Sequence, residues 1–336
     1  MGVDLGNIIK RKKIDIKDLS GRWVAVDAFN TLYQFLSIIR QPDGTPLMDD
    51  SGRVTSHLSG ILYRITNLVE SGAKVVFVFD GEPSHFKSET LDNRSKTRAV
   101  AEDKWEKARS EGLDGFKYAQ AASRLDEDII SDSKRLLDAM GISVVQAPSE
   151  GEAQAAQMAL RGDVDMVGSQ DYDSLLFGAP LVVRNMTIGG KRKLPNKNIY
   201  IDVPPELINL EDELSRLGID RKQLVEMGMM CGTDYNRGLE RVGPKTALKL
   251  IRKHGDLESV LAARNETIEN QEEIRDLFLH PPVTDDYTVK MDQPCAEEII
   301  AFLCDERSFS KERVEKAVRR LEEALDVEQS TLDRWF

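Results

Sequence analysis

The chain has 336 residues, of which 40% are apolar and 31% are charged, and its formal net charge is −12. This length and composition allow one large α/β domain or two smaller ones. No stretch approaches the roughly 20 apolar residues of a membrane span, and the start lacks the pattern of a secretory signal peptide. The cysteines have no zinc or redox spacing; they are Cys231, Cys295 and Cys304. We therefore expect an intracellular globular protein.

Residues 22 to 80 alternate between strand and helix patterns. The sequence predicts a strand at 22–27, a helix at 29–39, a second helix at 56–70 and a strand at 74–80. Further strands are expected at 142–145, 164–168 and 181–183. This alternation predicts an α/β fold with a mostly parallel central sheet flanked by helices.

The next segment, 84–130, breaks this pattern. Lys87 to Arg109 holds twelve charged residues and little apolar content, so helices here could not bury a full face. A solvated helical insertion is one interpretation. Because Lys87 and Arg94 come soon after Asp80, we favour a helical lid over a site near that residue.

Carboxylates follow the predicted apolar runs at several points of the chain. They are Asp27, Asp80, Glu150, Glu152, Asp171, Asp173 and Asp234. The carboxyl ends of parallel strands face one crevice, so we expect these side chains to lie together. A single acid at a strand end is more often a cap for the next helix. Glu150 and Glu152 form one pair with a single residue between them, and Asp171 and Asp173 form another. Capping a helix needs only one acid, so these pairs favour a further role.

An all-oxygen set without histidine suits Mg²⁺ or Mn²⁺. Neighbouring carboxylates oppose one another's ionisation unless a divalent ion offsets their charge. Two such ions roughly 4 Å apart form the usual clamp for phosphodiester cleavage. The carboxylates therefore favour phosphoryl chemistry.

Two basic stripes without acids stand out in this acidic chain. The first, 184–197, includes Arg184, Lys191, Arg192, Lys193 and Lys197, and the second, 241–254, includes Arg241, Lys245, Lys249, Arg252 and Lys253. A solvated helical face is the alternative for each stripe, but the two together favour phosphate contacts. The second stripe lies in a predicted helix-hairpin-helix unit at about 224–254, which can bind a DNA phosphate through backbone N–H groups.

The last elements are amphipathic helices near 296–304 and 311–325, followed by a polar and aromatic tail. The tail contains Gln329, Leu332, Trp335 and Phe336. Packing against the core is one interpretation of its aromatic pair. The spacing favours a one-turn anchor for the hydrophobic pocket of a partner.

Together these residues resemble the flap endonucleases, structure-specific 5′ nucleases of DNA replication and repair, and particularly their archaeal members. The likeness spans nearly the whole chain and rests on several motifs in the family's order. They are Met1-Gly2-Val3, Val78-Phe79-Asp80-Gly81, Ala147-Pro148-Ser149-Glu150-Gly151-Glu152-Ala153, Gln170-Asp171-Tyr172-Asp173, Gly232-Thr233-Asp234-Tyr235 and the tail. The interval from Asp80 to Glu150 is too short for the long insertion of the nucleotide-excision paralogue.

The resemblance implies one nuclease domain over 1–328 with a 5′-nuclease, PIN-like core. It comprises an N-terminal nuclease region at about 1–98, a helical arch within about 84–130, an internal nuclease region at about 120–260 and C-terminal helices to 328. Residues 329–336 would form a tail that binds the sliding clamp, proliferating cell nuclear antigen. A monomer in a prokaryotic cytoplasm, at the nucleoid, is expected.

The resemblance also assigns residues. The seven carboxylates would surround two Mg²⁺ ions, for which Mn²⁺ could substitute, and Lys87 and Arg94 would steer the scissile phosphate. DNA would contact Gly2 near the site, Tyr33 by stacking, and Arg40 and Thr55 where a short 3′ flap enters. The hairpin would hold duplex DNA, with a K⁺ ion on its carbonyls, through Arg241, Gly243, Lys245 and Thr246, and the first basic stripe would add Lys191, Arg192 and Lys193.

The function implied is cleavage of 5′ flaps at single-strand/duplex junctions, which leaves a 5′-phosphate, with 5′-3′ exonuclease activity beside it. The alternatives are a processive 5′-3′ exonuclease or an RNA-directed hydrolase on the same core, and a silent scaffold that binds branched DNA and the clamp. A phosphatase is disfavoured, since neither Asp27 nor Asp80 begins an Asp-x-Asp pair. One departure is Arg241, where relatives usually carry Gly.

Overall fold

The computed structural model describes most of the chain. Backbone and side chains are described for 2–87, 90, 96–97, 99–105, 107, 125–187 and 203–326, and the backbone alone for 190–193, 200–202 and 327–332. Of the residues with predicted roles, Arg94, Lys197, Trp335 and Phe336 lie outside the described residues. The side chains of Lys191, Arg192, Lys193, Gln329 and Leu332 also lie outside the described part.

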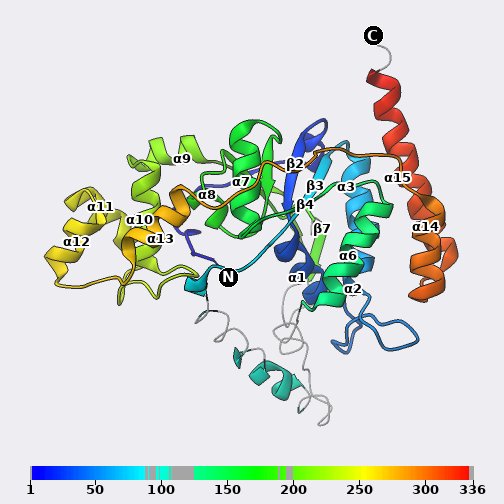
Figure 1. The fold of residues 1–336 in the computed structure, drawn as a ribbon, viewed down its shortest axis with the longest axis horizontal. Coiled ribbons are helices and arrows are strands. Elements are labelled where there is room, and N and C mark those ends of the chain that lie inside the picture. The colour runs from blue at the N-terminus through cyan, green and yellow to red at the C-terminus, as the bar shows by residue number, and fades with distance from the viewer. Residues whose placement is uncertain are drawn as a thin grey trace.

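A seven-stranded sheet with the order β1-β9-β6-β5-β2-β3-β4 forms the centre of the molecule (Figure 1). Its strands are β1 (Lys12–Lys13), β2 (Trp23–Asp27), β3 (Lys74–Phe79), β4 (Val144–Gln146), β5 (Met166–Gly168), β6 (Leu181–Arg184) and β9 (Glu206–Asn209). The five strands from β6 to β4 run parallel, and β9 pairs antiparallel with β6 and β1. The predicted mostly parallel sheet is therefore confirmed, although β4 and β5 each begin two residues later than predicted.

Alternate residues of the central strands face two separate hydrophobic clusters, so the sheet is covered on both sides. Ala25 of β2 packs in one cluster, and its neighbours Val24 and Val26 pack in the other. Burial on both faces explains why β3 is a continuous run of Val and Phe rather than an alternating one.

Helices of the first layer contribute to the hydrophobic cluster on the face that includes Ala25. They are α7 (Gly151–Arg161), α8 (Asp173–Leu176) and α10 (Arg221–Cys231). Four further helices share the left side of the molecule with α10 in Figure 1: α9 (Leu210–Leu217), α11 (Pro244–His254), α12 (Leu257–Arg264) and α13 (Gln271–Leu279).

Helices of the second layer contribute to the hydrophobic cluster on the face that includes Val24. They are α1 (Ala28–Ile38), the continuous run of α2 (Ser56–Gly60), the π-helical η2 (Ile61–Ile65) and α3 (Thr66–Glu70), then α6 (Glu127–Ala139), α14 (Ala296–Ile300), η4 (Ala301–Glu306) and α15 (Lys311–Leu332). The predicted helices at 29–39, 56–70, 296–304 and 311–325 are therefore confirmed. None of the described helices combines the length and apolar composition needed to cross a membrane.

Shorter elements complete the described chain. They are the 3₁₀ turns η1 (Ile16–Leu19) and η3 (His85–Lys87) and a separate antiparallel pair, β7 (Gly190–Lys193) and β8 (Tyr200–Val203). Residues 99–105 are helical, as the sequence predicts within 84–130. The helical alternative for the first basic stripe is wrong at 190–193, which form a strand.

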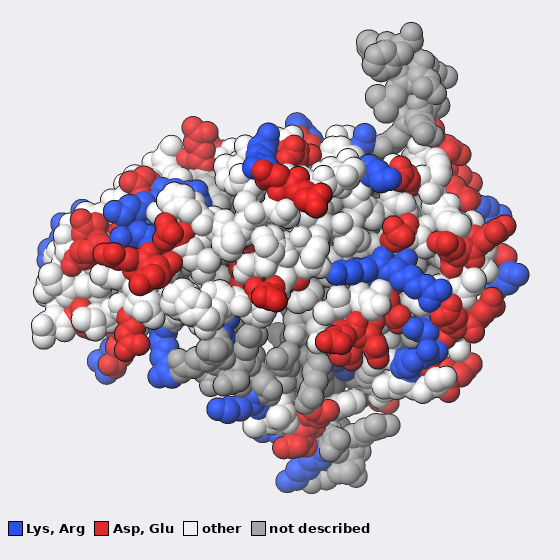
Figure 2. Space-filling model, viewed as in Figure 1, with Lys and Arg blue, Asp and Glu red and all other residues white. Residues whose placement is uncertain are grey.

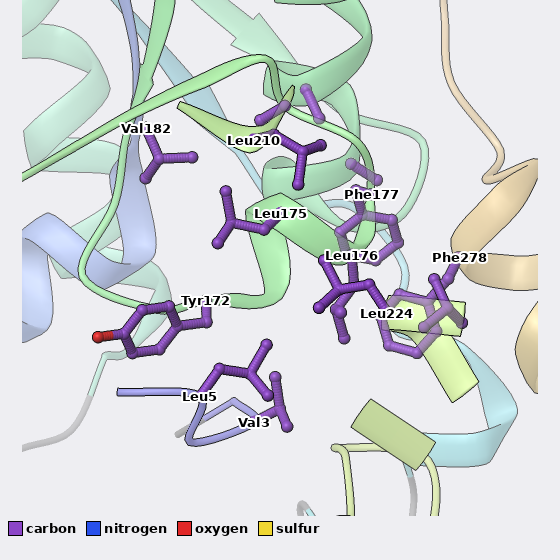
Figure 3. Packing of buried hydrophobic residues seen from close by; sticks show 14 of the residues in the cluster. Val3, Leu5, Tyr172, Leu175, Leu176, Phe177, Val182, Leu210, Leu224 and Phe278 are labelled. Carbon is purple, nitrogen blue, oxygen red and sulfur yellow. The ribbon is translucent and has the colours of Figure 1, made fainter. Parts of the chain in front are cut away.

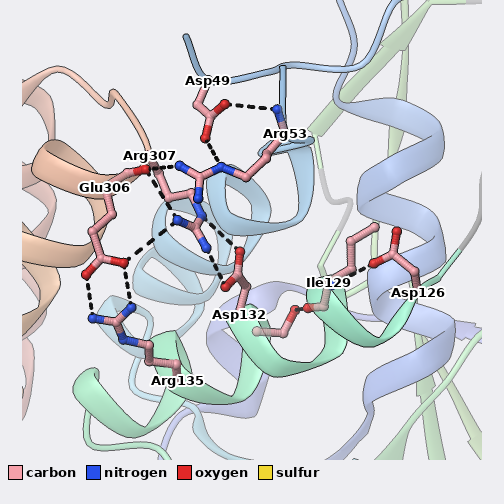
Figure 4. A network of polar contacts seen from close by, with 9 residues as sticks. Asp49, Arg53, Asp126, Ile129, Asp132, Arg135, Glu306 and Arg307 are labelled. Atoms are coloured by element: carbon pink, nitrogen blue, oxygen red, sulfur yellow. Dashed lines mark hydrogen bonds and ion pairs between the residues drawn. The ribbon is translucent and has the colours of Figure 1, made fainter. Parts of the chain in front are cut away.

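A network of ion pairs joins α6 and the loop before α2 to the C-terminal helices (Figure 4). Arg307 contacts Asp132 with two hydrogen bonds of 2.8 and 3.0 Å. Arg135 forms a bidentate pair with Glu306, at 2.7 and 2.8 Å, and Arg53 donates to the Glu306 carbonyl. The second layer is thus held together by charge-assisted bonds as well as by its apolar core.

His57 of α2 is fully buried near this network. Neither of its ring nitrogens has a hydrogen-bond partner among the described residues. Burial lowers the pKa of the imidazole to about 3, and the charge of Arg307 adds to this effect. The folded protein therefore holds His57 neutral where the unfolded chain, with an ordinary pKa near 6.5, takes up a proton.

We predict that His57 destabilises the fold as the pH falls. Because the folded pKa is depressed, the stability present above pH 6.5 is lost toward pH 3. At pH 5 the free energy of unfolding should be about 2 kcal/mol lower than at neutral pH. Each pH unit below the unfolded pKa of about 6.5 costs about 1.4 kcal/mol, and pH 5 lies about 1.5 units below it. Denaturant unfolding at pH 7.5 and pH 5 should show a smaller drop in the free energy of unfolding for His57→Leu than for the wild type. Equal drops would contradict this account.

Candidate active site

The seven predicted carboxylates lie around the carboxyl-end edge of the sheet. Asp27 is the last residue of β2, and Asp80 directly follows β3. The others come from the segments after β4 and β5 and from the loop after α10: Glu150, Glu152, Asp171, Asp173 and Asp234. Since β2, β3, β4 and β5 are parallel neighbours, these segments leave the sheet on the same side. The structure therefore brings together acids that are up to about two hundred residues apart in the sequence.

Asp27 serves both as a helix cap and as a member of this cluster. Its Oδ1 accepts a hydrogen bond from the backbone N–H of Asn30 at 3.0 Å and caps α1. Its Oδ2 is 3.4 Å from the hydroxyl of Ser169. The cap predicted as the ordinary role of a single Asp is therefore present, and it uses only one of the two oxygens.

Protein donors hold several of the other carboxylates in place. Glu152 Oε1 accepts hydrogen bonds from the hydroxyls of Ser169 and Ser174, both at 2.7 Å. Asp80 Oδ1 accepts from the backbone N–H of Gly151 at 2.7 Å, and a Cβ at residue 151 would lie only 2.6 Å from that oxygen. No sequence pattern marks the two serines as part of the site, although both stand beside the Asp171 and Asp173 pair.

The charges of these carboxylates act on one another. Burial raises the pKa of Asp27 well above its ordinary value, and the charge of Asp80 raises it further. Burial also raises the pKa of Glu152, with Asp27 as the next cause. Burial raises the pKa of Asp173 to about 7; the backbone hydrogen bond from Val3 opposes this rise, and the charges of Asp171 and Asp234 add smaller increases. The cluster thus resists full ionisation without a compensating cation.

Lys87, on η3, brings a cation to the cluster. Its ammonium donates to Glu150 and lies 3.8 Å from Asp234 Oδ2. Burial lowers the pKa of Lys87, but the charges of Glu150, Asp234 and Asp80 outweigh it, so the pKa stands above its ordinary value. The ammonium also lies 5.6 Å from the centre of the Tyr235 ring. Lys87 therefore carries its charge among the acids.

The N-terminal arm also reaches the cluster. Val3 donates its backbone N–H to Asp173 Oδ1 at 2.8 Å, and a Cβ at Gly2 would lie 2.1 Å from Asp173 Oδ2. Val3 and Leu5 are buried in the same hydrophobic cluster as Tyr172 (Figure 3). Packing of the arm thus places Gly2 against an acidic side chain, where only a residue without a Cβ fits.

The donor set fits a hard divalent cation, because it consists of carboxylates with no histidine and three of them have raised pKa values. As they stand, however, no three Asp, Glu, His or Cys side chains in the described residues are gathered closely enough to hold a metal ion. Several carboxylate oxygens point instead to Lys87, to serine hydroxyls and to backbone N–H groups. We call the seven acids the carboxylate ring. As they stand, they do not form a closed ligand sphere.

Three residues predicted to contact DNA lie along α1 and the loop after it. Tyr33 is half-buried on α1. Arg40 donates to the carbonyls of Leu36 and Gly44 at 2.8 and 2.7 Å, and Thr55 is only 4% exposed. Arg40 and Thr55 lie at the opposite end of α1 from Asp27, so the structure does not bring them to the carboxylates.

The predicted helix-hairpin-helix unit is formed by α10, the loop 232–243 and α11. Gly243 is the N-cap of α11 and Pro244 its first residue, so no side chain caps this helix end. Lys245 and Thr246 are exposed on its first turn. Acidic and basic side chains are interspersed over the face drawn in Figure 2. Among the described residues of that face in Figure 2, no large basic patch is seen. The uncapped N-terminus of α11, with Lys245 on its first turn, is suited to bind an anion by itself.

Arg241 has a strained backbone in this hairpin. Its φ is +59°, in the left-handed region that glycine adopts without cost. Its side chain is 91% exposed and lies 3.5 Å from the equally exposed Glu240. The hairpin keeps a glycine-like turn although residue 241 has a long cationic side chain.

The chain is similar to known proteins over its whole length. The XPG N-terminal domain matches residues 1–101, and the XPG I-region matches residues 141–234. Flap endonuclease 1 of Methanothrix thermoacetophila is 65% identical over 336 residues, and that of Archaeoglobus fulgidus is 56% identical over 337 residues, with 100% of both chains covered in each case.

Solved structures agree with the sequence matches. Flap endonuclease-1 from Methanococcus jannaschii has a TM-score of 0.78 at 38% identity, covering 97% of this chain and 100% of that chain. The catalytic core of Rad2 in complex with DNA substrate shares the fold, with a TM-score of 0.70 at 24% identity over 94% of this chain and 97% of that chain. Because full-length relatives exceed half identity, the chain belongs to the flap endonuclease 1 family, with archaeal members among its relatives.

Proposed function

We propose that this protein is a structure-specific DNA endonuclease that removes 5′ flaps at single-strand/duplex junctions in replication and repair, leaving a 5′-phosphate. The observation that carries the proposal is the set of seven carboxylates, with the Lys87 ammonium next to Glu150 and Asp234, at the edge of the sheet where α/β folds bind ligands. The membership of the flap endonuclease 1 family supports the same activity.

The carboxylates would hold two divalent ions, Mg²⁺ or Mn²⁺. Such ions supply an activated water and neutralise the charge that develops on the departing oxygen. Lys87 retains its proton next to Glu150, so its ammonium is available to orient the scissile phosphate. Arg94 is proposed to assist it. Asp173, held by the Val3 N–H, keeps one fixed orientation toward the cluster.

DNA would be bound through its backbone rather than through its bases. The first turn of α11, with Gly243, Lys245 and Thr246, is proposed to hold one phosphate of the duplex, with a K⁺ ion on the hairpin carbonyls. The first basic stripe would add the cations of Lys191, Arg192 and Lys193 to this contact. Cleavage should therefore be independent of sequence.

The DNA near the cut would meet other residues. Tyr33 would stack on a base near the cut, with Gly2 close to the site, and a short 3′ flap would contact Arg40 and Thr55.

Arg241 gives a prediction that separates charge from backbone strain. Arg241→Gly and Arg241→Ala both remove a cation, so both should weaken flap binding and lower the salt slope by about 1. Only Arg241→Gly also relieves the left-handed backbone, which should raise the free energy of unfolding by about 1 kcal/mol. Salt-dependent binding and denaturant unfolding measure the two effects. Unchanged binding and salt slope in Arg241→Ala would remove Arg241 from the DNA interface.

The tail is proposed to bind the sliding clamp, proliferating cell nuclear antigen, through Gln329, Leu332, Trp335 and Phe336. Truncation before Gln329 should leave cleavage of free flap DNA unchanged, because the carboxylate ring lies elsewhere, and should abolish stimulation by the clamp. Flap cleavage rates with and without the archaeal clamp would measure this. If the clamp still stimulates the truncated protein, the tail does not bind the clamp, and the alternative, packing of its aromatic pair against the core, is favoured.

The proposal is tested by comparing cleavage rates on flap, nicked and blunt duplex substrates in Mg²⁺. We expect the flap to be cut far faster than the blunt duplex. Equal rates on all three would favour a processive 5′-3′ exonuclease, and tight flap binding without any cleavage would favour a branched-DNA scaffold. The enzyme is proposed to act as a monomer in a prokaryotic cytoplasm, at the nucleoid.

A further inference from the structure

Asn30 contacts two members of the carboxylate ring. Its backbone N–H donates to Asp27 Oδ1 at 3.0 Å, and its side-chain Nδ2 donates to Asp171 Oδ2 at 3.1 Å. It also approaches the segment after β5 through its own Oδ1, which lies 3.4 Å from the backbone nitrogen of Gln170. One residue of α1 therefore connects the end of β2 with the acidic segment that follows β5.

The orientation of the Asn30 amide is fixed by a second residue. Gln34, one helical turn along α1, donates from Nε2 to Asn30 Oδ1 at 2.7 Å. Since that oxygen is engaged as an acceptor, the amide group that faces Asp171 is the donor end. Thr187 donates to Gln34 Oε1 at 3.3 Å, so the Gln34 amide is itself oriented. The polar chain runs from Thr187 through Gln34 and Asn30 to Asp171.

The position of Asn30 in α1 makes this contact separable from helix formation. Asn30 is the third residue of α1, and the cap on Asp27 uses its backbone N–H, which every substitution except proline retains. Alanine has a higher helix propensity than asparagine. Removing the side chain therefore leaves the capped helix and takes away the donor to Asp171, together with the oxygen that accepts from Gln34 and from the Gln170 N–H.

We propose that Asn30 is a positioning residue for Asp171 in the nuclease site, and that Gln34 sets the amide orientation that this requires. The inference rests on the proposed function, because it takes Asp171 as a ligand of a divalent ion. A carboxylate ligand that accepts a hydrogen bond is restricted to one orientation, and loss of such a partner typically weakens metal binding about 10- to 100-fold.

The experiment measures Mn²⁺ binding to the full-length protein without DNA, from the electron paramagnetic resonance signal of free Mn²⁺. Asn30→Ala should weaken Mn²⁺ binding about 10- to 100-fold, and Gln34→Ala should weaken it less. The matched control is Asn67→Ala, an exposed asparagine of α3 that contacts Arg320 instead of the ring. That variant should bind Mn²⁺ as the wild type does.

Two further measurements exclude a merely structural effect. In Asn30→Ala the Mg²⁺ concentration for half-maximal flap cleavage should rise about 10-fold or more, while flap affinity in Ca²⁺ should change less than about 2-fold. In the Asp171→Ala background, Asn30→Ala should cause no further loss of Mn²⁺ binding, because the two residues act through one contact.

The failures of the two proposals differ. If the wild type binds Mn²⁺ and cuts flaps but Asn30→Ala binds Mn²⁺ equally well, the positioning role is overturned and the proposed function stands. A full additional loss from Asn30→Ala in the Asp171→Ala background would also overturn it. If the wild type neither binds Mn²⁺ nor cuts flap DNA, the proposed function fails, and the role of Asn30 fails with it.

Discussion

Asp171→Ala should bind flap DNA with nearly the affinity of the wild type and cut it on the order of 10³-fold more slowly. Metal ligation supplies several kcal/mol of transition-state stabilisation, and each 1.36 kcal/mol corresponds to about tenfold in rate. Asp171 is half-buried, and its side chain is held by Asn30 at 3.1 Å. Its loss therefore removes a carboxylate from the ring without opening the core. Single-turnover cleavage and equilibrium binding of the same flap measure the two effects.

The matched control is the same substitution at the other end of β5. Asp165 precedes this strand and accepts hydrogen bonds from the Arg22 side chain and the Trp23 backbone N–H, at 2.8 and 2.7 Å. Asp165→Ala should reduce the free energy of unfolding by about 1–3 kcal/mol, because it leaves these donors unpaired. Its cleavage rate should stay within a few-fold of the wild type. Near-normal cleavage by Asp171→Ala would take Asp171 out of the site.

Lys87→Met should lower the single-turnover cleavage rate by about 10²- to 10³-fold, the usual cost of removing one preorganised donor. Methionine retains most of the length of the side chain and removes only the charge and the donor. Flap affinity should change much less, because the ammonium lies among buried acids rather than on an exposed face. The measurement is cleavage at saturating enzyme together with the dissociation constant of the flap.

Lys290→Met controls for the loss of a cation in general. Lys290 pairs with Asp292 on the surface and is 60% exposed, whereas the Lys87 side chain is 14% exposed. We expect this variant to cleave as the wild type does. Equal effects of the two substitutions would show that Lys87 acts through net charge and not through its place in the ring.

Sequence patterns located the acids because these acids follow regular elements. Asp27 and Asp80 stand at the ends of runs that are buried on both faces, and such runs are recognisable without a structure. Once the strands are taken as parallel, their carboxyl ends must meet at one edge, and the ring follows from topology. The phosphate-steering role of Lys87 and the K⁺ ion at the hairpin came from resemblance to the family, which composition alone would not have given.

The parts that could not be predicted depend on contacts between distant residues. The bond between Asn30 and Asp171 joins positions 141 residues apart, and no local pattern marks it. Strand β1 consists only of Lys12 and Lys13 and exists because β9 pairs with it. Lys191 and Lys193 of the first basic stripe lie on β7, whose pairing with β8 is likewise set by tertiary structure. Propensity does not determine such edge strands.

The most direct test of the account is to map, to the nucleotide, the cleavage of an end-labelled double-flap DNA with and without Mg²⁺, beside a matched blunt duplex. We expect one cut at the junction that requires Mg²⁺, a product with a 5′-phosphate and an intact duplex. Stepwise loss from the 5′ ends of both substrates, or binding without any cut in Mg²⁺, would contradict the account.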